Sequence, residues 1–509
     1  MRKLSLLLLF AFCCINIYSQ GQAAHWYFGY NSGFDFTNRY TANNAVINGV
    51  TGQTVNNIPQ FVTGPISTYE GCFTISDKSG NLLFSSDGIT VYNKLNQAMP
   101  NGQDLKGRSS AAQSGIVIPR PGHPDNYYIV TTSASEQTPH RGMHYYEIDM
   151  TLDGGKGDVI PNSETQIQFV NQAGTTIYSA LQAYENIAAV GHANGIDYWL
   201  VHRIRRYFFV WKVTREGIAD KADIYDIGID PPVHVYPGYT KFSGDGKYIA
   251  NAYSNTSTFT IGKFDNATGA ITNIKTRGSL GYSNAYTMEF SPNNKYLYFT
   301  FYYTGPVMRL SVNSLLNGTA ETPQLVMNSV TNIQMGPDGR IYGIASKDRS
   351  SSVYRNLYMI LDPDQDNIAD IKCTYIPNYF PAANGSHLSL TNFTSSFFGM
   401  DEIKVEPKDK CINQNLTFSV QINTGTGSNS VNKIVWDFGD GTPIVTDSNM
   451  DKYYFTQTHA YAKRGIYNIT LTPYRSDGTA ITDKTQTIQI KVGSCTLPVN
   501  HNISNMEYK

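Results

Sequence analysis

The feature that most constrains the fold of this 509-residue chain is a pattern that recurs along residues 25–400. An apolar strand runs into a turn of Gly, Asp or Asn, and an aromatic-rich strand follows it. Because Asp-Gly and Asn-Asn accept the positive φ angles of tight turns, each repeat predicts a β-hairpin. The repeats read CFTISDKSGNLLFSS (72–86), IVIPRPGHPDNYYIVTT (116–132), AAVGHANGIDYWLVH (188–202), TKFSGDGKYIANAYS (240–254), MEFSPNNKYLYFTFY (288–302) and IQMGPDGRIYGIAS (333–346).

The spacing of these hairpins predicts how they are arranged. Phe242, Phe290 and Met335 hold equivalent positions, separated by 48 residues (290 − 242) and 45 residues (335 − 290). A period of about 40–50 residues built from short strands is typical of a β-propeller. Both faces of KYLYFTFYY (295–303) are bulky, which suits a blade packed between two others. We therefore expect an all-β propeller of seven blades over residues 20–400, with six blades as the alternative; stacked sandwiches would turn every 8–12 residues instead.

The two ends of this region are expected to close the ring. AHWYFGYNSGFDF (24–36) reads as a strand pair ahead of the first clear blade, and HLSLTNFTSSFF (387–398) as a strand after the last one. We expect these two ends to share a blade. Cys72 and Cys373 lie in the first and last parts of the ring and could form a disulfide there, the alternative being two buried thiols.

After Phe398 the pattern changes to evenly spaced short strands without the long period. LTFSVQI (416–422), KIVWDFGDG (433–441), GIYNITLTPY (465–474) and TQTIQIKV (485–492) predict one β-sandwich over residues 401–497, followed by a tail at 498–509. Cys411 and Cys495 bracket the sandwich. A bridge between them would remove loop entropy from the unfolded chain, worth on the order of 4 kcal/mol.

The first residues predict export. Arg2 and Lys3 precede an apolar run from Leu4 to Cys14, which is too short to span a bilayer and reads as a signal peptide over residues 1–19. A lipid-anchored cysteine at Cys13 or Cys14 is the alternative. No later stretch is long enough for a transmembrane helix. Without Arg2 and Lys3 the chain has 37 basic residues (39 − 2) against 40 acidic ones, a net charge near −3 that does not favour nucleic-acid binding.

WDFGDG (436–441) is the most specific short motif in the chain and allows three interpretations. A calcium loop needs closely repeated carboxylates, but no third one follows until Asp447. A kinase Asp-Phe-Gly needs companion signatures that are missing from the sequence. A strand end and turn fits better, with Trp436 in the core, aspartates that accept backbone N–H groups, and glycines that allow the bend.

The same stretch, with THAYAKRGIYNITL (458–471), resembles a PKD (polycystic-kidney-disease-type) domain. The resemblance implies an extracellular immunoglobulin-like sandwich that acts as a spacer or contact module. The matching residues are Trp436, Asp437, Phe438, Gly439, Asp440, Gly441, His459, Tyr461, Gly465 and Tyr467.

The first 400 residues resemble the N-terminal region of PKD-containing surface proteins of gliding bacteria with type IX secretion. The segments that carry this resemblance include HWYFGYNSGFDF (25–36), HANGIDYWLV (192–201) and QMGPDGRIYG (334–343). Such proteins often end in a sorting domain, whereas here TLPVNHNISNMEYK follows Cys495. The sequence thus leaves the export route and the anchor open.

Motifs of known catalytic chemistry are missing from the sequence. It contains no G-x-S-x-G, no H-E-x-x-H, no P-loop and no Rossmann fingerprint, and we assign no catalytic residue and no organic cofactor. His123, His192 and His202 lie in or beside hairpins, where a structural role is expected.

One acidic loop could bind a structural calcium ion. LDPDQDNIAD (361–370) places Asp362, Asp364 and Asp366 at alternating positions, with Asp370 four residues further on. Asn367 stands where a calcium loop has glycine, and Cys373 where it has glutamate. A solvated loop between two blade strands is the alternative.

These observations favour an exported, non-enzymatic interaction module at the cell surface, in the periplasm or outside the cell. Its propeller loops would bind a polysaccharide or a surface protein, and its oligomeric state is left open. One alternative is a polysaccharide lyase or hydrolase with carboxylates converging on the propeller axis, since propellers host such sites. A second alternative is a purely structural spacer.

Overall fold

The computed structural model describes most of the chain with a few gaps. The predicted signal peptide (1–19) and the tail (498–509) lie outside the described residues. The described ranges are 21–134, 140–228, 237–253, 258–278, 280–302, 305–345, 352–398, 403–406, 410–422, 431–448, 450, 454–482 and 485–494.

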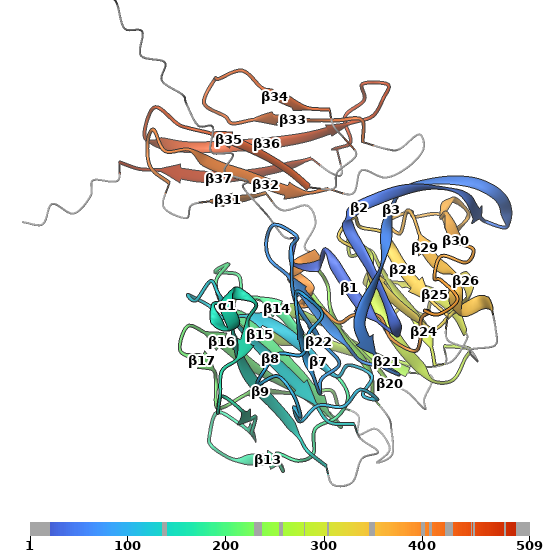
Figure 1. Cartoon of the computed structure of the whole chain (residues 1–509). Coiled ribbons are helices and arrows are strands. Elements are labelled where there is room, and N and C mark those ends of the chain that lie inside the picture. The colour runs from blue at the N-terminus through green and yellow to red at the C-terminus, as the bar shows by residue number, and fades with distance from the viewer. Residues whose placement is uncertain are drawn as a thin grey trace, which may run out of the picture.

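The part of the chain before Phe398 is a β-propeller, a ring of antiparallel sheets, all but one of which are built from strands that follow one another closely in the described chain (Figure 1). The first strand of each sheet lies beside the first strand of the next sheet, from β4 through β7, β14, β19 and β23 to β27. The strands before the middle of the ring are β4 (Phe73–Ser76), β5 (Leu82–Ser86) and β6 (Val91–Asn93), then β7 (Gly115–Pro119), β8 (Asn126–Thr132), β9 (Met143–Asp149), β10 (Asp158–Val159) and β11 (Thr165–Gln166), then the pair β12 (Phe169–Val170) and β13 (Thr176–Tyr178), then β14 (Ala188–Gly191), β15 (Tyr198–Ile204), β16 (Tyr207–Thr214), β17 (Gly217–Ile218) and β18 (Asp223–Asp226).

The remaining sheets follow the predicted repeats closely. Their strands are β19 (Pro237–Phe242), β20 (Tyr248–Tyr253), β21 (Thr258–Asp265) and β22 (Ala270–Arg277), then β23 (Ala285–Phe290), β24 (Tyr296–Phe301), β25 (Gly305–Ser311) and β26 (Gln324–Val330), then β27 (Asn332–Met335), β28 (Ile341–Ile344), β29 (Leu357–Ile360) and β30 (Cys373–Ile376). Helices are short and lie in connections: α1 (Leu152–Gly155), α2 (Val312–Asn317) and the 3-10 turns η1 (Gly21–Ala23), η2 (Ser352–Arg355), η3 (Ile368–Asp370) and η4 (Ser395–Phe398).

The ring closes through the N-terminal strands β1 (His25–Phe28), β2 (Tyr30–Ile47) and β3 (Val50–Ser67). β1 pairs with β2, which confirms the strand pair expected over 24–36, and β1 also lies beside β4. The far end of β2 pairs with β30, so one sheet holds both the first and the last strands. Figure 1 shows β2 and β3 as a long hairpin that arches away from the ring. The ring has seven blades if β1–β3 are counted as a blade of their own, and six if they are counted as an extension of the last sheet. The number of blades therefore stays a prediction.

The segment 387–398 was expected to be a strand of the closing blade, and this is wrong. It runs through the centre of the ring and bonds to the first strands of several sheets. The Leu388 N–H donates to the Tyr69 carbonyl (3.2 Å), and the Asn392 N–H donates to the Cys72 carbonyl (2.8 Å). The Thr394 hydroxyl donates to the Val117 carbonyl (2.7 Å). Its alternating Leu and polar residues resemble a strand, but here the polar side chains satisfy backbone groups at the axis. We call residues 384–398 the axial segment.

Both faces of the blade strands are covered, as the aromatic alternation predicted. Tyr298 and Phe299 point to opposite faces of β24 and both are fully buried. Apolar clusters fill the spaces between consecutive sheets, and the largest one joins β1, β2, β28 and the axial segment. There Trp26 packs against Tyr342 and Phe393, with ring centroids 5.8 and 5.7 Å away.

The C-terminal unit is an immunoglobulin-like sandwich with its own apolar core (Figure 1). One sheet has the order β31-β32-β35, and the other has the order β34-β33-β36-β37. Trp436 on β33 is fully buried between them, as predicted. The strands are β31 (Lys404–Glu406), β32 (Leu416–Gln421), β33 (Lys433–Asp437), β34 (Val445–Asp447), β35 (Tyr454–His459), β36 (Gly465–Tyr474) and β37 (Gln486–Val492).

The cysteines behave differently in the two units. Cys72 and Cys373 are free thiols, so the disulfide considered between them does not form. The reason is that β2, not β4, pairs with β30, which leaves Cys72 in one apolar cluster and Cys373 in another. In the sandwich, the backbone of Cys411 forms an isolated parallel β-bridge with Gly493. The Cys411–Cys495 disulfide stays a prediction, because Cys495 lies outside the described residues.

Candidate functional site

The WDFGDG turn directs its carboxylates onto its own backbone and one histidine. Asp437 accepts the Gly439 N–H (2.9 Å), and Asp440 accepts both the N–H (3.1 Å) and the hydroxyl (2.6 Å) of Thr442. The second oxygen of Asp440 lies 2.8 Å from His459 Nε2. Burial acts to raise the pKa of the Asp440 carboxyl, but the hydrogen bonds from Thr442 and His459 outweigh burial and lower this pKa. Both carboxylates therefore organise the turn.

The other residues of the motif pack around this turn. His459 stacks on Phe438 with centroids 4.2 Å apart, and the Tyr461 hydroxyl donates to the Phe438 carbonyl (3.0 Å). Tyr467 stacks on Tyr461 (4.2 Å). Gly439 has φ of 72°, and a Cβ there would lie 2.2 Å from the Asn468 carbonyl, so only glycine fits. These contacts fit the predicted structural role.

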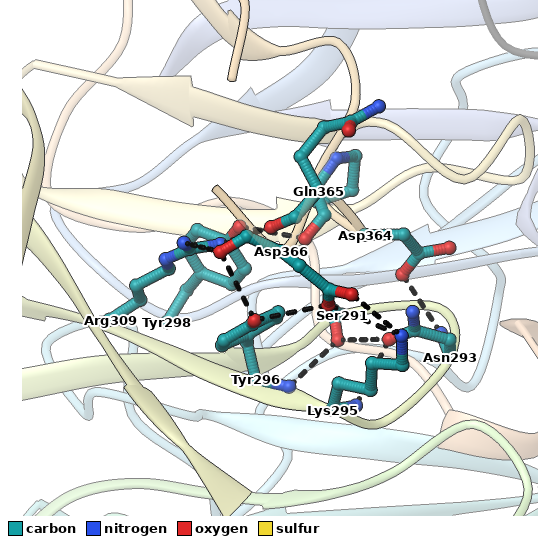
Figure 2. Close-up of polar contacts among 10 residues, drawn as sticks. Ser291, Asn293, Lys295, Tyr296, Tyr298, Arg309, Asp364, Gln365 and Asp366 are labelled. Carbon is teal, nitrogen blue, oxygen red and sulfur yellow. Dashed lines mark hydrogen bonds and ion pairs between the residues drawn. The ribbon is translucent and has the colours of Figure 1, made fainter. Parts of the chain in front are cut away.

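The predicted calcium loop is held by hydrogen bonds and an ion pair to the preceding sheet. Figure 2 shows the contacts of this loop with the β23–β24 turn. Asp364 accepts the Asn293 N–H (3.0 Å), and both oxygens of Asp366 lie 3.2 Å from Lys295 Nζ. The hydrogen bond from Lys295 lowers the pKa of Asp366.

The backbone of the same loop is held as firmly as its side chains. Arg309 on β25 donates to the Gln365 carbonyl (2.6 Å) and to the Asp366 carbonyl (2.9 Å), and the Tyr298 hydroxyl donates to the Pro363 carbonyl (2.7 Å; Figure 2). We call this set of contacts the loop latch. It joins the β29–β30 connection to the neighbouring blade.

The four aspartates are not gathered into a metal site. Asp362 is buried 3.9 Å from Lys372, Asp370 ends the turn η3, and the other two contact the β23–β24 turn. Within the described ranges, no group of three or more His, Cys, Asp or Glu side chains is arranged to hold a metal ion. Alternating spacing along the loop therefore did not translate into convergence in space.

Two of the histidines named from the sequence, His192 and His202, make structural contacts. His192 Nδ1 accepts the Asn194 N–H (2.9 Å) inside its turn, and its ring stacks on Trp199. His202 is fully buried, accepts the Tyr184 N–H (3.1 Å), and contacts the Asn186 carbonyl. Burial lowers the pKa of His202 to about 3.

One arrangement that the sequence did not signal is a Ser–His–Asp series. His25 lies 3.2 Å from the Ser76 hydroxyl through Nδ1 and 3.4 Å from Asp35 through Nε2. Burial lowers the pKa of His25, although Asp35 opposes this. Because Ser76 is fully buried, no substrate carbonyl can reach its hydroxyl. No local motif joins these residues, which come from three different strands.

The propeller axis carries buried charged groups whose partners belong to the chain itself. Lys241 Nζ lies 3.0 Å from Glu289 and donates to Gln334 (2.7 Å). Glu70 accepts the Tyr286 hydroxyl (2.8 Å), and Tyr286 also lies 3.5 Å from Ser389 of the axial segment. An enzyme would need an open axial funnel of carboxylates with His or Arg, and in this region residues of the axial segment instead bond to the surrounding strands.

An open hollow of about 440 Å³ lies instead between the β19–β22 and β23–β26 sheets. Its wall contains the lysines Lys247, Lys263 and Lys295, and four asparagines from the β23–β24 turn and from α2. Tyr248 and Tyr296 contribute rings, and Val312 and Leu316 are the aliphatic members of the wall. We call this the lysine hollow.

Two turns with the same hydrogen bonds build the lysine hollow. In SGDGKY (243–248), Ser243 donates to Asp245 (2.8 Å) and accepts the Tyr248 N–H (3.0 Å). In SPNNKY (291–296), the matching bonds run from Ser291 to Asn293 (2.9 Å) and from the Tyr296 N–H to Ser291 (3.0 Å). The repeated turn therefore places a Lys-Tyr pair at the same point of two adjacent blades. The sequence repeat predicted the turns but not the space between them.

Comparison with known proteins supports the C-terminal assignment. Residues 403–492 match the family model described as PKD domain, so the sandwich is a PKD domain. No curated protein matches the sequence of the chain. No helix in the described ranges is both long and apolar enough to cross a membrane.

Solved structures similar to this chain include three proteins that are described as having different activities. A Bacteroides uniformis protein with a provisional 6-phosphogluconolactonase assignment is 13% identical, covers 77% of this chain and all of its own, and has a TM-score of 0.36. Hydrazine synthase of Kuenenia stuttgartiensis is 11% identical, with 74% and 92% covered and a TM-score of 0.35. The periplasmic gluconolactonase of Pseudomonas aeruginosa is 9% identical, with 80% and 92% covered and a TM-score of 0.33. Likeness at this level carries no argument about activity.

Proposed function

We propose that the chain is an exported, non-enzymatic binding protein whose propeller turns contact a polysaccharide, with the PKD domain as a spacer or second contact module. The single observation that carries the proposal is the contrast between a filled axis and an open, polar hollow on the turns. Ligand sites are concave, with placed polar groups that fix the orientation of the ligand, and the lysine hollow is a concave surface that offers such groups.

The loss of the axis as a site weighs against the enzyme alternative. Carboxylates at the axis bond to the chain's own Lys241, Tyr286 and backbone N–H groups. Acid–base catalysis on a glycan requires such groups to reach the substrate. A surface protein remains the second class of partner, and the calcium ion considered for residues 361–370 would have to displace the loop latch.

Export and surface location complete the proposal. They rest on the predicted signal peptide over residues 1–19 and on the PKD domain at 403–492. From the sequence resemblance we also propose that the chain belongs with the surface proteins of gliding bacteria. A disulfide between Cys411 and Cys495 would suit the same location.

Retention on immobilised glycans, with turnover measured in parallel, tests this function. The full chain without residues 1–19 is passed over an array of neutral and acidic polysaccharides, and new reducing ends are measured in solution. We expect retention of at least one polysaccharide without chain cleavage. Sustained release of reducing ends or unsaturated products would replace the proposal with the enzyme, and retention of none would reject polysaccharide binding.

A further inference from the structure

The three lysines of the hollow differ in whether they form ion pairs with residues of the described ranges. Lys247 pairs with Asp245 of its own turn (2.8 Å), and Lys295 pairs with Asp366 of the loop latch. Lys263 on β21 is exposed and forms no ion pair with any residue of the described ranges. The wall holds three lysines against one aspartate, a net charge of +2, or +1 when Asp366 is included.

The neutral groups of the wall suit hydroxyl-rich ligands. Asn313 and Asn317 are exposed and bond to each other (3.0 Å), so their remaining amide groups face solvent. Amide groups both donate and accept, as pairs of sugar hydroxyls do. Val312 and Leu316 are buried, at 3% and 5% exposure, and leave little apolar surface for a peptide side chain.

We propose that the lysine hollow binds a carboxylated polysaccharide, a uronic-acid chain whose carboxylate pairs with Lys263. The inference rests on the proposed function and names its ligand class. A carboxylate would form a charge-assisted hydrogen bond with an ammonium group that lacks a partner in the described chain. A peptide would need a free strand edge or apolar pockets; the wall consists of turns, α2 and strands such as β21 that are paired on both sides, and it offers neither.

Removal of the Lys263 charge is the main test. Isothermal titration uses the full chain without residues 1–19, with oligogalacturonate as the probe and its methyl ester as the matched neutral ligand. We expect Lys263→Ala to weaken oligogalacturonate binding by about tenfold and to leave binding of the ester unchanged. Lys275→Ala, an exposed lysine on β22 outside the hollow, is the matched control and should bind as the unchanged chain does.

A second variant raises the affinity without disturbing the turn. Asp245→Asn removes the one carboxylate of the wall, and the equivalent position of the next blade is Asn293, which makes the same hydrogen bonds. Lys247 is then released from its ion pair, and oligogalacturonate should bind about two- to threefold more tightly at low salt. This gain cannot result from a folding defect.

The outcomes separate the inference from the proposed function. If the ester and the acid bind with equal affinity and neither variant changes this affinity, the inference of a carboxylate ligand is overturned. If a glycan is still retained in that case, the proposed polysaccharide-binding function stands. Lys263-dependent binding of oligoglutamate but not of oligogalacturonate overturns it in favour of an acidic peptide. No retention of any glycan, with no titration signal from either probe, rejects both proposals.

Discussion

The propeller axis and the lysine hollow are built from the same residue types but differ in what those residues contact. At the axis, Lys241 is 3% exposed and bonds to Glu289 and Gln334. In the hollow, Lys263 is exposed and meets no carboxylate of the described chain. Burial of a charge without a partner costs several kcal/mol, so the axial groups had to be paired for the ring to fold. The hollow is under no such demand.

Asparagine shows the same difference. Asn392 of the axial segment accepts from the Gln113 amide (3.2 Å) and donates to the Gly115 carbonyl (2.9 Å) and the Ile187 carbonyl (3.4 Å). Asn313 and Asn317 in the hollow bond to each other and are otherwise exposed to solvent. Residue type alone therefore does not identify a binding site, and the number of internal partners separates the two regions.

The largest effect is expected from Lys241→Met. The variant leaves Glu289 charged and buried at 1% exposure, which should lower the free energy of unfolding of the propeller by roughly 3–5 kcal/mol. Urea unfolding followed by tryptophan fluorescence measures this in a Trp436→Phe background, so that the signal reports on the propeller alone.

Two companion variants decide whether the pairing is the cause. Lys263→Met in the hollow should change stability by less than about 0.5 kcal/mol. Lys241→Met with Glu289→Gln should recover a large part of the loss, because no unpaired charge remains. Equal losses at Lys241 and Lys263 would contradict the distinction between the two regions.

A smaller loss is expected from Asn392→Ala. The change removes one acceptor of the buried Gln113 amide, which keeps its bond to the Thr240 carbonyl, and the donor of two backbone carbonyls; each group left unsatisfied costs about 1–3 kcal/mol before neighbours readjust. We expect a loss of roughly 3 kcal/mol in the same unfolding assay. Asn317→Ala on α2 is the matched control and should be nearly neutral. An unchanged stability of Asn392→Ala would show that the axial segment does not hold the ring together.

Local features of the fold could be predicted from the sequence, and long-range ones could not. The SGDGKY and SPNNKY turns form as predicted because their hydrogen bonds join residues two to five positions apart. The route of residues 387–398 depends on strand ends up to 364 positions away, such as the Tyr27 carbonyl that accepts from Thr391. Alternation of Leu388 and Leu390 with polar residues fits a strand and an axial segment equally well.

The candidate sites show the same limit. Spacing alone suggested that Asp362, Asp364, Asp366 and Asp370 could converge on calcium. The position of the loop depends instead on contacts with Lys295, 71 positions away from Asp366, and with Arg309, 56 positions away from Gln365. The lysine hollow was missed for the corresponding reason, since Lys247 and Lys295 become neighbours only when two blades pack together.

A pH effect of intermediate size should arise in the propeller interior. The pKa of His202 is lowered by burial from 6.5 to about 3, so below pH 6.5 the unfolded chain binds a proton that the folded chain excludes. The free energy of unfolding should therefore fall by up to about 1.4 kcal/mol per pH unit between pH 6.5 and 3, or about 2 kcal/mol from pH 7 to 5. Urea unfolding at several pH values measures the slope.

The variant His202→Gln assigns that slope to one residue. Glutamine can still accept the Tyr184 N–H, and it does not titrate. The slope should shrink but not vanish, because burial lowers the pKa of His25 in the same sense. A slope that persists unchanged in His202→Gln would rule out this histidine as its source.

The smallest effect is expected from Asp366→Asn in the loop latch, which also bears on the hollow. The Lys295–Asp366 pair is largely exposed, at 54% and 70%, so its loss should change stability by about 0.5 kcal/mol or less. The backbone bonds from Arg309 and Tyr298 keep the loop in place. Lys295, which lines the hollow, then loses this ion pair, and oligogalacturonate should bind slightly more tightly in isothermal titration. Excess calcium should shift the melting temperature of neither protein. A calcium-dependent rise in the original chain that disappears in Asp366→Asn would instead show that residues 361–370 bind the metal, and that the latch is one of two states of this loop.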